Sequence, residues 1–318
     1  MRVLITGADG FVGRHLIGRL LRERVPGAPP IERLVSLDVA PRRVSLDSRV
    51  KQVTGTLGDP RVVNEALGGG LDCIFHLACV PGRAAEDDYE RGLEANFTGS
   101  LALLEGLRRG SRRTHPPVRV IFASSVAVFG SPLPERVDDD TLPSPAMSYA
   151  SQKLMTECLI QEYTRRHWID GLALRLSGIL ARPAGSVANL SAFFNDVLHA
   201  AKDGRPFTLP LRPELASWLM SVECCVDNLL HAAQLAPETL PTRRAWTLPA
   251  LRVSMRELVE ALAVRYGAKT RELIGCVPNT ALEAVFGQPP LFTAMAERLG
   301  FRHDGDTGRL IERAMAAA

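Results

Sequence analysis

Two residues of contrasting chemistry, Tyr149 and Lys153, lie four positions apart in the sequence. A free phenol has a pKa near ~10, so it is a poor proton acceptor at neutral pH. Lowering that pKa to near ~7 requires about 4 kcal/mol of extra stabilisation of the phenolate, which a nearby ammonium group can supply. On a helix, positions four apart lie on one face. The spacing therefore indicates a tyrosine general base with a lysine partner; a solvated helix face with an incidental lysine is the alternative.

Three glycines, Gly7, Gly10 and Gly13, follow the apolar segment that begins the chain and precede an amphipathic one. A strand, a glycine turn and a helix start together offer a tight bend, a backbone without Cβ atoms and free N–H groups. A dinucleotide pyrophosphate needs all three. The spacing is Gly-x-x-Gly-x-x-Gly rather than the tighter Gly-x-Gly-x-x-Gly, and a glycine turn without a ligand is the alternative.

A carboxylate, Asp38, ends the second predicted strand, where it would accept hydrogen bonds from the adenosine ribose hydroxyls. A 2′-phosphate at ~4 Å from this carboxylate would cost about 4 kcal/mol at a surface-like dielectric. Asp9, inside the glycine loop, adds a second negative charge, whereas Arg42 and Arg43 would favour a phosphate. The two carboxylates predict NAD rather than NADP as the cofactor.

The elements that must position these residues are visible in the hydrophobic pattern. In the first 180 residues, short apolar runs alternate with amphipathic stretches of helical period. This alternation is typical of an α/β fold, a Rossmann-type doubly wound parallel sheet covered by helices on both faces. We expect strands at 2–6, 34–38, 50–54, 73–77, 118–124 and 172–176. We expect helices at 12–24, 60–67, 89–109 and 149–166.

Beyond Ser177 the alternation ends. We expect helices there at 192–202, 222–236, 256–266, 281–286 and 307–318, and a strand at 245–249. The simplest organisation is an NAD-binding Rossmann domain over 1–177, with return segments at about 220–249. A smaller C-terminal substrate-binding lobe would then consist of 178–219 and 250–318.

Composition and charge exclude several classes of function. The chain has 318 residues, 46% of them hydrophobic and 23% charged, with a net charge of +3 and no basic stripe interleaved with aromatics. No apolar run reaches the ~18 residues of a membrane helix, and the chain opens directly into its first strand without a signal peptide. The six cysteines lack Cys-x-x-Cys spacing. We therefore expect a cytoplasmic protein with free thiols and no metal, nucleic-acid or membrane partner.

Several motifs together resemble the extended short-chain dehydrogenase/reductases, over essentially the whole chain. They are GADGFVG (7–13), Asp38, FHLA (75–78), Asn96, SSVAVFG (124–130), YASQK (149–153) and LRLSG (174–178). The resemblance implies a catalytic set of Ser125, Tyr149 and Lys153, with Ser124 as a structural neighbour. It implies NAD binding by Gly7, Gly10, Phe11, Val12, Gly13, Asp38, Thr56, Leu57, Leu77, Ala78, Asn96, Tyr149, Lys153, Ser177 and Ile179. Asn96 would in addition hold a helix and its water network in position.

Within this superfamily, the chain is most similar to the D-erythronate dehydrogenases. SSVAVFGSPLP, SYASQK and SWLMSVECCVDNLLHA (217–232) resemble the corresponding segments of that group. Nucleotide-sugar epimerases usually carry an Arg-Asp-aromatic-Ile-His-Val run where this chain has Ala216, Ser217 and Trp218. Two positions depart from the superfamily pattern: Thr56 replaces the acid usual near the adenine, and Ser177 replaces a proline common beside the nicotinamide.

The resemblance implies that Tyr149, as phenolate, takes the proton of a secondary alcohol while a hydride passes to the nicotinamide. Lys153 would lower the pKa of Tyr149 and bind the nicotinamide ribose, and Ser125 would hold the substrate oxygen. With D-erythronate the reaction would occur at C2 and give the 2-oxo acid.

A substrate carboxylate calls for a cationic or amide clamp. Arg182 and Asn189 are the candidates, with Arg83 as a third, so the predicted substrate contacts are Ser125, Tyr149, Arg182 and Asn189. Each arginine could equally be a surface charge, and Asn189 could cap the following helix. Trp218 could wall the substrate pocket or belong to the core, and His76 is expected to be a buried strand residue.

Two other functions remain open. A nucleotide-sugar epimerase or dehydratase would oxidise and re-reduce its substrate on retained NAD, and would need diphosphate-binding arginines such as Arg212, Arg252 and Arg256. A non-catalytic NAD sensor is disfavoured because both Tyr149 and Lys153 are present. The resemblance also implies a homodimer, in which the predicted helices 89–109 and 149–166 pair across a two-fold axis; their apolar stripes could instead face the sheet.

Overall fold

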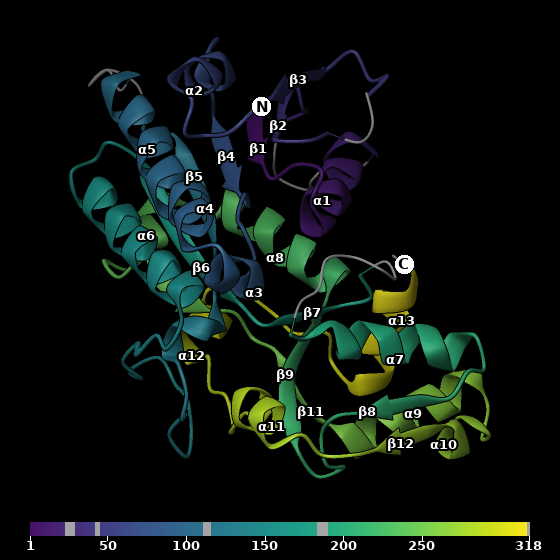
Figure 1. Ribbon diagram of the computed structural model, residues 1–318. Helices are drawn as coiled ribbons and strands as arrows, with labels where there is room; N and C mark the ends of the chain where they lie inside the picture. The colour runs from purple at the N-terminus through teal and green to yellow at the C-terminus, as the bar shows by residue number, and fades with distance from the viewer. Residues whose placement is uncertain (23–28, 42–44, 111–115, 183–189, 317–318) are drawn as a thin grey trace. The chain divides into compact units, whose positions relative to one another are not determined.

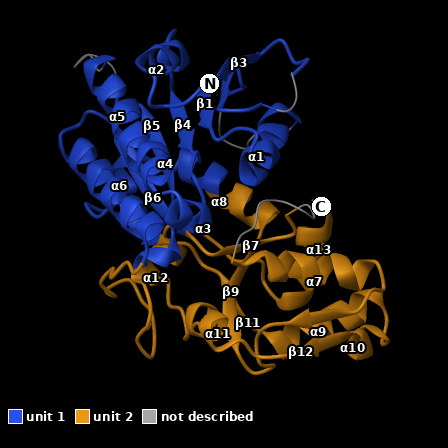
Figure 2. Ribbon diagram, viewed as in Figure 1, with its two compact units in different colours: residues 1–128, 147–175, 229–246 blue, residues 129–146, 176–228, 247–318 orange. Residues whose placement is uncertain are grey.

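The computed structural model describes residues 1–22, 29–41, 45–110, 116–182 and 190–316. They form two compact units, coloured separately in Figure 2. Unit 1 consists of Met1–Val128, Met147–Arg175 and Leu229–Trp246, and unit 2 of Phe129–Ala146, Leu176–Asn228 and Thr247–Ala318. Among the described residues, no helix has the length and apolar character needed to cross a membrane.

Unit 1 is built on a seven-stranded sheet in the order β10-β6-β5-β4-β1-β2-β3. The strands are β1 Arg2–Thr6, β2 Arg33–Asp38, β3 Val50–Thr54, β4 Cys73–His76, β5 Arg119–Ser125, β6 Asp170–Leu176 and β10 Ala245–Thr247. The pairs β1–β2, β2–β3, β1–β4 and β4–β5 are parallel. The strand order reverses between β1 and β4, and ligands of such sheets bind at the carboxyl ends of the strands at this point. The predicted doubly wound sheet is confirmed.

Helices cover this sheet because its central strands carry runs of buried apolar residues. Val3, Leu4 and Ile5 of β1 are completely buried. In Figure 1, α5 and α6 lie side by side on one face and α1 lies on the other. The helices are α1 Phe11–Arg22, α2 Pro60–Leu67, α3 Gly82–Asp87, α4 Tyr89–Leu93, α5 Gly99–Gly110 and α6 Ser148–Arg165.

The predicted helix 89–109 is divided in the structure. A π-helical turn, η1 Glu94–Thr98, separates α4 from α5. Asn96 lies in this turn, and its side chain bonds to the backbone of Val80. Gly99 follows the turn at a close approach, since a Cβ there would lie 2.9 Å from the Cβ of Leu57. The wider turn thus accommodates one side-chain anchor and one tight packing contact, and such π-turns occur frequently at functional sites.

Unit 2 contains two small sheets and most of the C-terminal helices. Strands β7 Gly178–Leu180, β9 Ala216–Ser221 and β11 Leu251–Ser254 form one sheet, and β8 Phe207–Leu209 pairs with β12 Ile274–Cys276 in the other. The helices are α7 Ala192–Lys202, α8 Val222–Gln234, which continues into unit 1, α9 Met255–Tyr266, α10 Thr270–Leu273, α11 Thr280–Phe286, α12 Ala294–Arg298 and α13 Thr307–Ala316. Leu198, Leu219, Leu258 and Leu310 are among the buried residues of its core.

One segment lies in a different unit from the one its sequence position suggests. Residues Phe129–Ala146, inside the expected N-terminal domain, group with unit 2. Val137 N–H donates to Pro290 O at 3.0 Å, and Phe292 N–H donates to Val137 O at 2.8 Å. Ser131 Oγ–H donates to Ala284 O, also at 3.0 Å. These long-range bonds attach the segment to the C-terminal residues, and no local sequence pattern predicts them.

Candidate active site

The glycine loop makes an unusually tight connection from β1 to α1. Gly7 has a φ of 68°, and a Cβ on it would lie 2.7 Å from Ala78 N. A Cβ on Gly13 would lie 2.4 Å from Gly7 O. Gly10 N–H donates to Gly7 O at 3.1 Å and closes the turn. Side chains are therefore excluded where a pyrophosphate would approach the backbone, and Phe11 and Val12 begin the helix at that point.

The carboxylate of Asp38 is held at the edge of this loop. Its Oδ2 accepts a hydrogen bond from Asp9 N–H at 2.9 Å, and its Oδ1 accepts one from Ala40 N–H at 3.4 Å. These contacts fix an acidic group at the carboxyl end of β2, where a ribose would lie in a dinucleotide fold. Arg42 and Arg43 lie outside the described residues. The glycine cradle and the fixed acid together fit a dinucleotide.

Four other predicted cofactor contacts of unit 1, Leu77, Ala78, Thr56 and Leu57, follow the ends of β4 and β3. Leu77 N–H donates to Thr6 O at 3.1 Å, and Ala78 N–H donates to Thr6 Oγ1 at 3.2 Å. Thr56 Oγ1 accepts from Gly58 N–H at 3.2 Å. Leu57 is only 4% exposed and packs in the core, so its side chain faces away from solvent.

Asn96 cross-links the backbone beneath the site. Its Oδ1 accepts from Val80 N–H at 2.7 Å, its Nδ2 donates to Val80 O at 3.0 Å, and its amide lies 2.7 Å from the side-chain amide of Gln152. The residue is 1% exposed. Its amide is thus occupied by protein groups, a geometry suited to holding α6 and the segment after β4 in position.

The three predicted catalytic residues all belong to unit 1. Ser125 is the last residue of β5, and Tyr149 and Lys153 lie on consecutive turns of α6. The Nζ atom of Lys153 donates to Ala123 O at 2.7 Å and lies 5.6 Å from the ring centroid of Tyr149. Ser125 and Tyr149 are half-buried, whereas Lys153 is 1% exposed. The lysine is therefore anchored to the strand end that carries Ser125, beside the tyrosine ring.

The electrostatic surroundings of Lys153 have opposing effects. Burial lowers its pKa from the ordinary value, while the nearby Cys79 and Glu157 raise it. Its ammonium also lies 4.6 Å from the ring centroid of Phe122, a favourable cation–π distance. Sequence reasoning missed Glu157, although a glutamate four positions after Lys153 shares its helix face.

The predicted nicotinamide and substrate residues that follow β6 lie in unit 2. The hydroxyl of Ser177 is buried and has no hydrogen-bond partner within the described part of the chain. Ile179 lies in β7 and is 9% exposed. Arg182 N–H donates to Asn195 Oδ1 at 3.0 Å, which fixes the Arg182 backbone. Asn189 lies outside the described residues, so its predicted role and that of the Arg182 side chain stay predictions.

Two other candidates have structural surroundings. Arg83 is exposed and its Nε lies 2.9 Å from Asp87 Oδ1 in a surface ion pair, and its role as a clamp stays a prediction. Trp218 is 1% exposed and its Nε1–H donates to Pro289 O at 2.8 Å, so it is a core residue of unit 2.

His76 connects β1 to α5 inside unit 1. Its Nδ1 lies 2.7 Å from Thr6 Oγ1, and its Nε2 lies 2.7 Å from Ser100 Oγ. Complete burial, assisted by the charge of Lys153, lowers the pKa of His76 to about 3. The imidazole is therefore neutral in the folded protein at physiological pH, as a buried structural residue requires.

This burial predicts a pH-dependent stability. An unfolded histidine takes up a proton below about pH 6.5, whereas folded His76 does so only near pH 3, so its contribution is complete above pH 6.5 and is lost as the pH falls towards 3. We expect this residue to remove on the order of 3 kcal/mol of unfolding free energy between pH 7 and pH 4. Urea denaturation should show a flatter pH dependence for His76→Asn than for the wild type; parallel curves would contradict the prediction.

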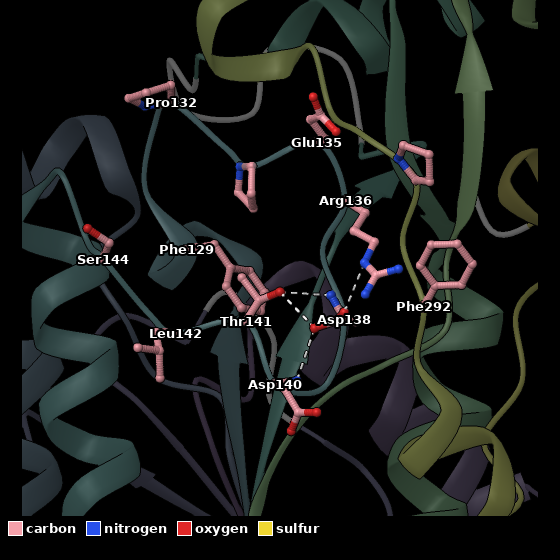
Figure 3. A pocket seen from close by; sticks show the side chains of 12 residues that line it. Phe129, Pro132, Glu135, Arg136, Asp138, Asp140, Thr141, Leu142, Ser144 and Phe292 are labelled. Atoms are coloured by element: carbon pink, nitrogen blue, oxygen red, sulfur yellow. Dashed lines mark hydrogen bonds and ion pairs between the residues drawn. The ribbon is translucent and has the colours of Figure 1, made fainter.

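Unit 2 also has an open hollow of about 960 Å³, drawn in Figure 3. It is lined by side chains of 129–144 and by Pro290 and Phe292. Arg136 pairs with Asp138 at 3.3 Å, and Thr141 Oγ1–H donates to Asp138 at 3.0 Å. None of the predicted site residues lines this hollow, and the charges of Arg136 and Asp138 satisfy each other.

Comparisons with known proteins find a matching family model and relatives that are similar over nearly the whole chain. The model of the NAD dependent epimerase/dehydratase family matches residues 3–212. The chain is 38% identical to the D-erythronate dehydrogenase of Cupriavidus necator, over 100% of this chain and 99% of that protein. It is 32% identical to the D-erythronate dehydrogenase of Haemophilus influenzae, over 98% of each.

Among solved structures, the nucleoside-diphosphate-sugar epimerase from Agrobacterium tumefaciens has a TM-score of 0.92 and 30% identity, with 100% of this chain and 95% of that chain covered. Full-length similarity of this extent, together with the glycine cradle and the Tyr149–Lys153 pair, is consistent with a nicotinamide cofactor. The chain therefore belongs to the NAD dependent epimerase/dehydratase family, within the extended short-chain dehydrogenase/reductases.

Proposed function

We propose that this protein is an NAD-dependent sugar-acid dehydrogenase that oxidises D-erythronate at C2 to the 2-oxo acid. One observation carries the proposal. The buried ammonium of Lys153 donates a hydrogen bond to the carbonyl of Ala123, two residues before Ser125 at the end of β5, and lies beside the ring of Tyr149. Similarity to two D-erythronate dehydrogenases along their full length supports the choice of substrate.

In this mechanism the residues of α6 and β5 act on a single substrate oxygen. Tyr149, as phenolate, takes the proton of the C2 hydroxyl. Ser125 donates a hydrogen bond to the same oxygen and stabilises the charge that develops on it. When bound, the nicotinamide would accept the hydride, that is, the C2 hydrogen together with the electron pair of the C2–H bond. Lys153 keeps Tyr149 ionised and binds the nicotinamide ribose, and the proton on Tyr149 then returns to solvent.

We propose NAD rather than NADP as the cofactor, because Asp38 is held where the ribose would lie. Replacing Asp38 by Ser removes the carboxylate that would repel a 2′-phosphate. The ratio of the Kd for NADPH to the Kd for NADH should fall by up to about 1000-fold, since about 4 kcal/mol of repulsion corresponds to that factor. Fluorescence titration of both cofactors measures the ratio. As a comparison, Asp9→Asn should change it less; an unchanged ratio in Asp38→Ser would rule out Asp38 as the discriminating group.

The substrate proposal is tested with a panel of four-carbon sugar acids and NAD, followed by NADH absorbance. Accumulation of NADH with D-erythronate supports the dehydrogenase. Absence of NADH with every sugar acid, combined with conversion of a UDP-sugar, would instead identify a nucleotide-sugar epimerase.

That second candidate is favoured by the similarity to the Agrobacterium epimerase structure. The arginines available for a diphosphate argue against it, because each already has a partner. Arg212 lies 2.5 Å from Glu283 Oε2, Arg256 pairs with Glu214, and Arg252 Nε–H donates to Gln288 O at 2.8 Å.

We further propose that unit 2 is the substrate-binding part, with Arg182 and Asn189 clamping the carboxylate, and that the protein is a cytoplasmic homodimer. The predicted dimer helices pack only part of their apolar side chains against the sheet. Leu104 and Tyr163 are buried against it, whereas Met155 is 38% exposed and Cys158 is exposed on α6. A monomeric mass in solution would contradict the dimer.

A further inference from the structure

A buried carboxylate, Glu157, lies on α6 one turn beyond Lys153 and is held by charged and polar partners on two strands. Its Oε2 lies 2.7 Å from Arg175 Nη2, and its Oε1 accepts from Arg175 Nε–H at 3.0 Å. Ser124 Oγ–H donates to Oε1 at 2.5 Å. The side chains of Arg175 and Glu157 are 5% and 3% exposed. Burying such a pair removes two charges from water, and its net contribution to stability is often small or unfavourable.

The position of this pair relates it to the candidate site. Tyr149, Lys153 and Glu157 follow one another at four-residue intervals and share one face of α6. On the facing strand β5, Ala123 holds Lys153 through its carbonyl and Ser124 holds Glu157 through its hydroxyl. The next residue is Ser125. Two consecutive strand residues thus fix two consecutive charged side chains of the helix, immediately before the predicted catalytic serine.

Among the groups around Lys153, Glu157 supplies a negative charge that favours the protonated lysine. From β4 and the segment after it come His76, which burial keeps neutral, and Cys79. From β5 come the Phe122 ring and the Ala123 carbonyl. From α6 come Tyr149 and Glu157, and from β6 comes Arg175, which is bonded to Glu157. Burial opposes the charge of Lys153, and Glu157 offsets part of that cost.

We propose that Glu157 is a positioning residue that acts through Lys153: its carboxylate, locked by Arg175 and Ser124, fixes α6 against β5 and keeps the Lys153 ammonium charged. This inference rests on the proposed function, in which Lys153 binds the nicotinamide ribose and ionises Tyr149. It assigns Glu157 no contact with substrate or cofactor.

The test is the pH dependence of NADH binding, measured by NADH fluorescence with Glu157→Gln, which removes the charge and keeps the shape. In the wild type, we expect the affinity for NADH to fall at alkaline pH, when Lys153 loses its proton. In Glu157→Gln this fall should begin about one pH unit lower, because the charge that favours the ammonium is gone. The alkaline limb of kcat with D-erythronate should move in the same direction.

The matched control is Asp170→Asn, which breaks another buried ion pair of the same sheet, Arg119–Asp170 at 2.6 Å. It should lower the Tm and leave both pH profiles in place. If Glu157→Gln lowers the Tm in the same way and shifts neither profile, Glu157 is merely structural and the inference is overturned.

A second variant guards against failure of Glu157→Gln to fold. Ser124→Ala keeps the ion pair with Arg175 and should shift NADH binding in the same direction by a smaller amount; no shift in a folded Ser124→Ala protein also counts against the inference. A wild type that binds NADH but oxidises no sugar acid refutes the proposed function alone, because the NADH titrations still decide the role of Glu157.

Discussion

Replacing Tyr149 by Phe is expected to lower kcat for sugar-acid oxidation by about 10²- to 10⁴-fold while the Kd for NADH changes less than about threefold. The large effect follows because the phenolate is the proposed general base, and such groups contribute roughly this factor. The cofactor effect is small because the glycine loop and Asp38, which hold the dinucleotide, remain intact. Steady-state kinetics and NADH fluorescence measure the two quantities separately.

Tyr163 provides a matched control on the same helix. Its hydroxyl donates to Glu105, and burial together with that carboxylate raises its pKa to about 12, so it cannot serve as a base near neutrality. Tyr163→Phe should cost on the order of 1 kcal/mol of stability and leave kcat within about twofold. Turnover in Tyr149→Phe comparable with that of Tyr163→Phe would exclude Tyr149 as the base.

The second large effect is expected from Gly7→Ala. The φ of 68° at Gly7 is strained for any residue with a Cβ, and that atom would lie 2.7 Å from Ala78 N and 2.9 Å from Leu77 C. Backbone cannot move aside as a flexible side chain can, so the loop must shift. A loss of about 3 kcal/mol of binding would raise the Kd for NADH ~100-fold. The Tm should fall as well, because the same contacts join β1 to β4.

Gly110→Ala is the appropriate comparison, because a Cβ at Gly110, the last residue of α5, would meet nothing within 4 Å. It should bind NADH as the wild type does. Equal NADH affinity in Gly7→Ala and Gly110→Ala would contradict the assignment of the glycine loop to the pyrophosphate.

The parts of the fold that could be predicted are those with a strong local pattern. The long apolar runs of β1 and β5 are buried on both faces, so their sequences identify them. The strands β8 and β12 have only three residues each and depend on pairing with a distant segment. The π-turn at Asn96 likewise depends on Val80, sixteen residues away.

The residues of the candidate site likewise fall into those that a local pattern predicts and those that depend on distant contacts. Glycine spacing, Asp38 and the Tyr149–Lys153 offset are local, and a resemblance to known enzymes adds Ser125. Glu157 could have been suspected from its position after Lys153, and Arg175 from a charge inside an apolar strand. Their pairing, however, joins residues eighteen positions apart through the packing of α6 on the sheet. Sequence pattern alone does not reveal such a contact.

The most direct test of the proposed site is the pH dependence of kcat for NAD-dependent oxidation of D-erythronate by the wild-type protein. If Lys153 keeps Tyr149 ionised, kcat should rise through a single ionisation near pH ~7 and stay level to about pH 9. A rate that rises only near pH ~10, where a free phenol ionises, would contradict the pairing of Tyr149 with Lys153.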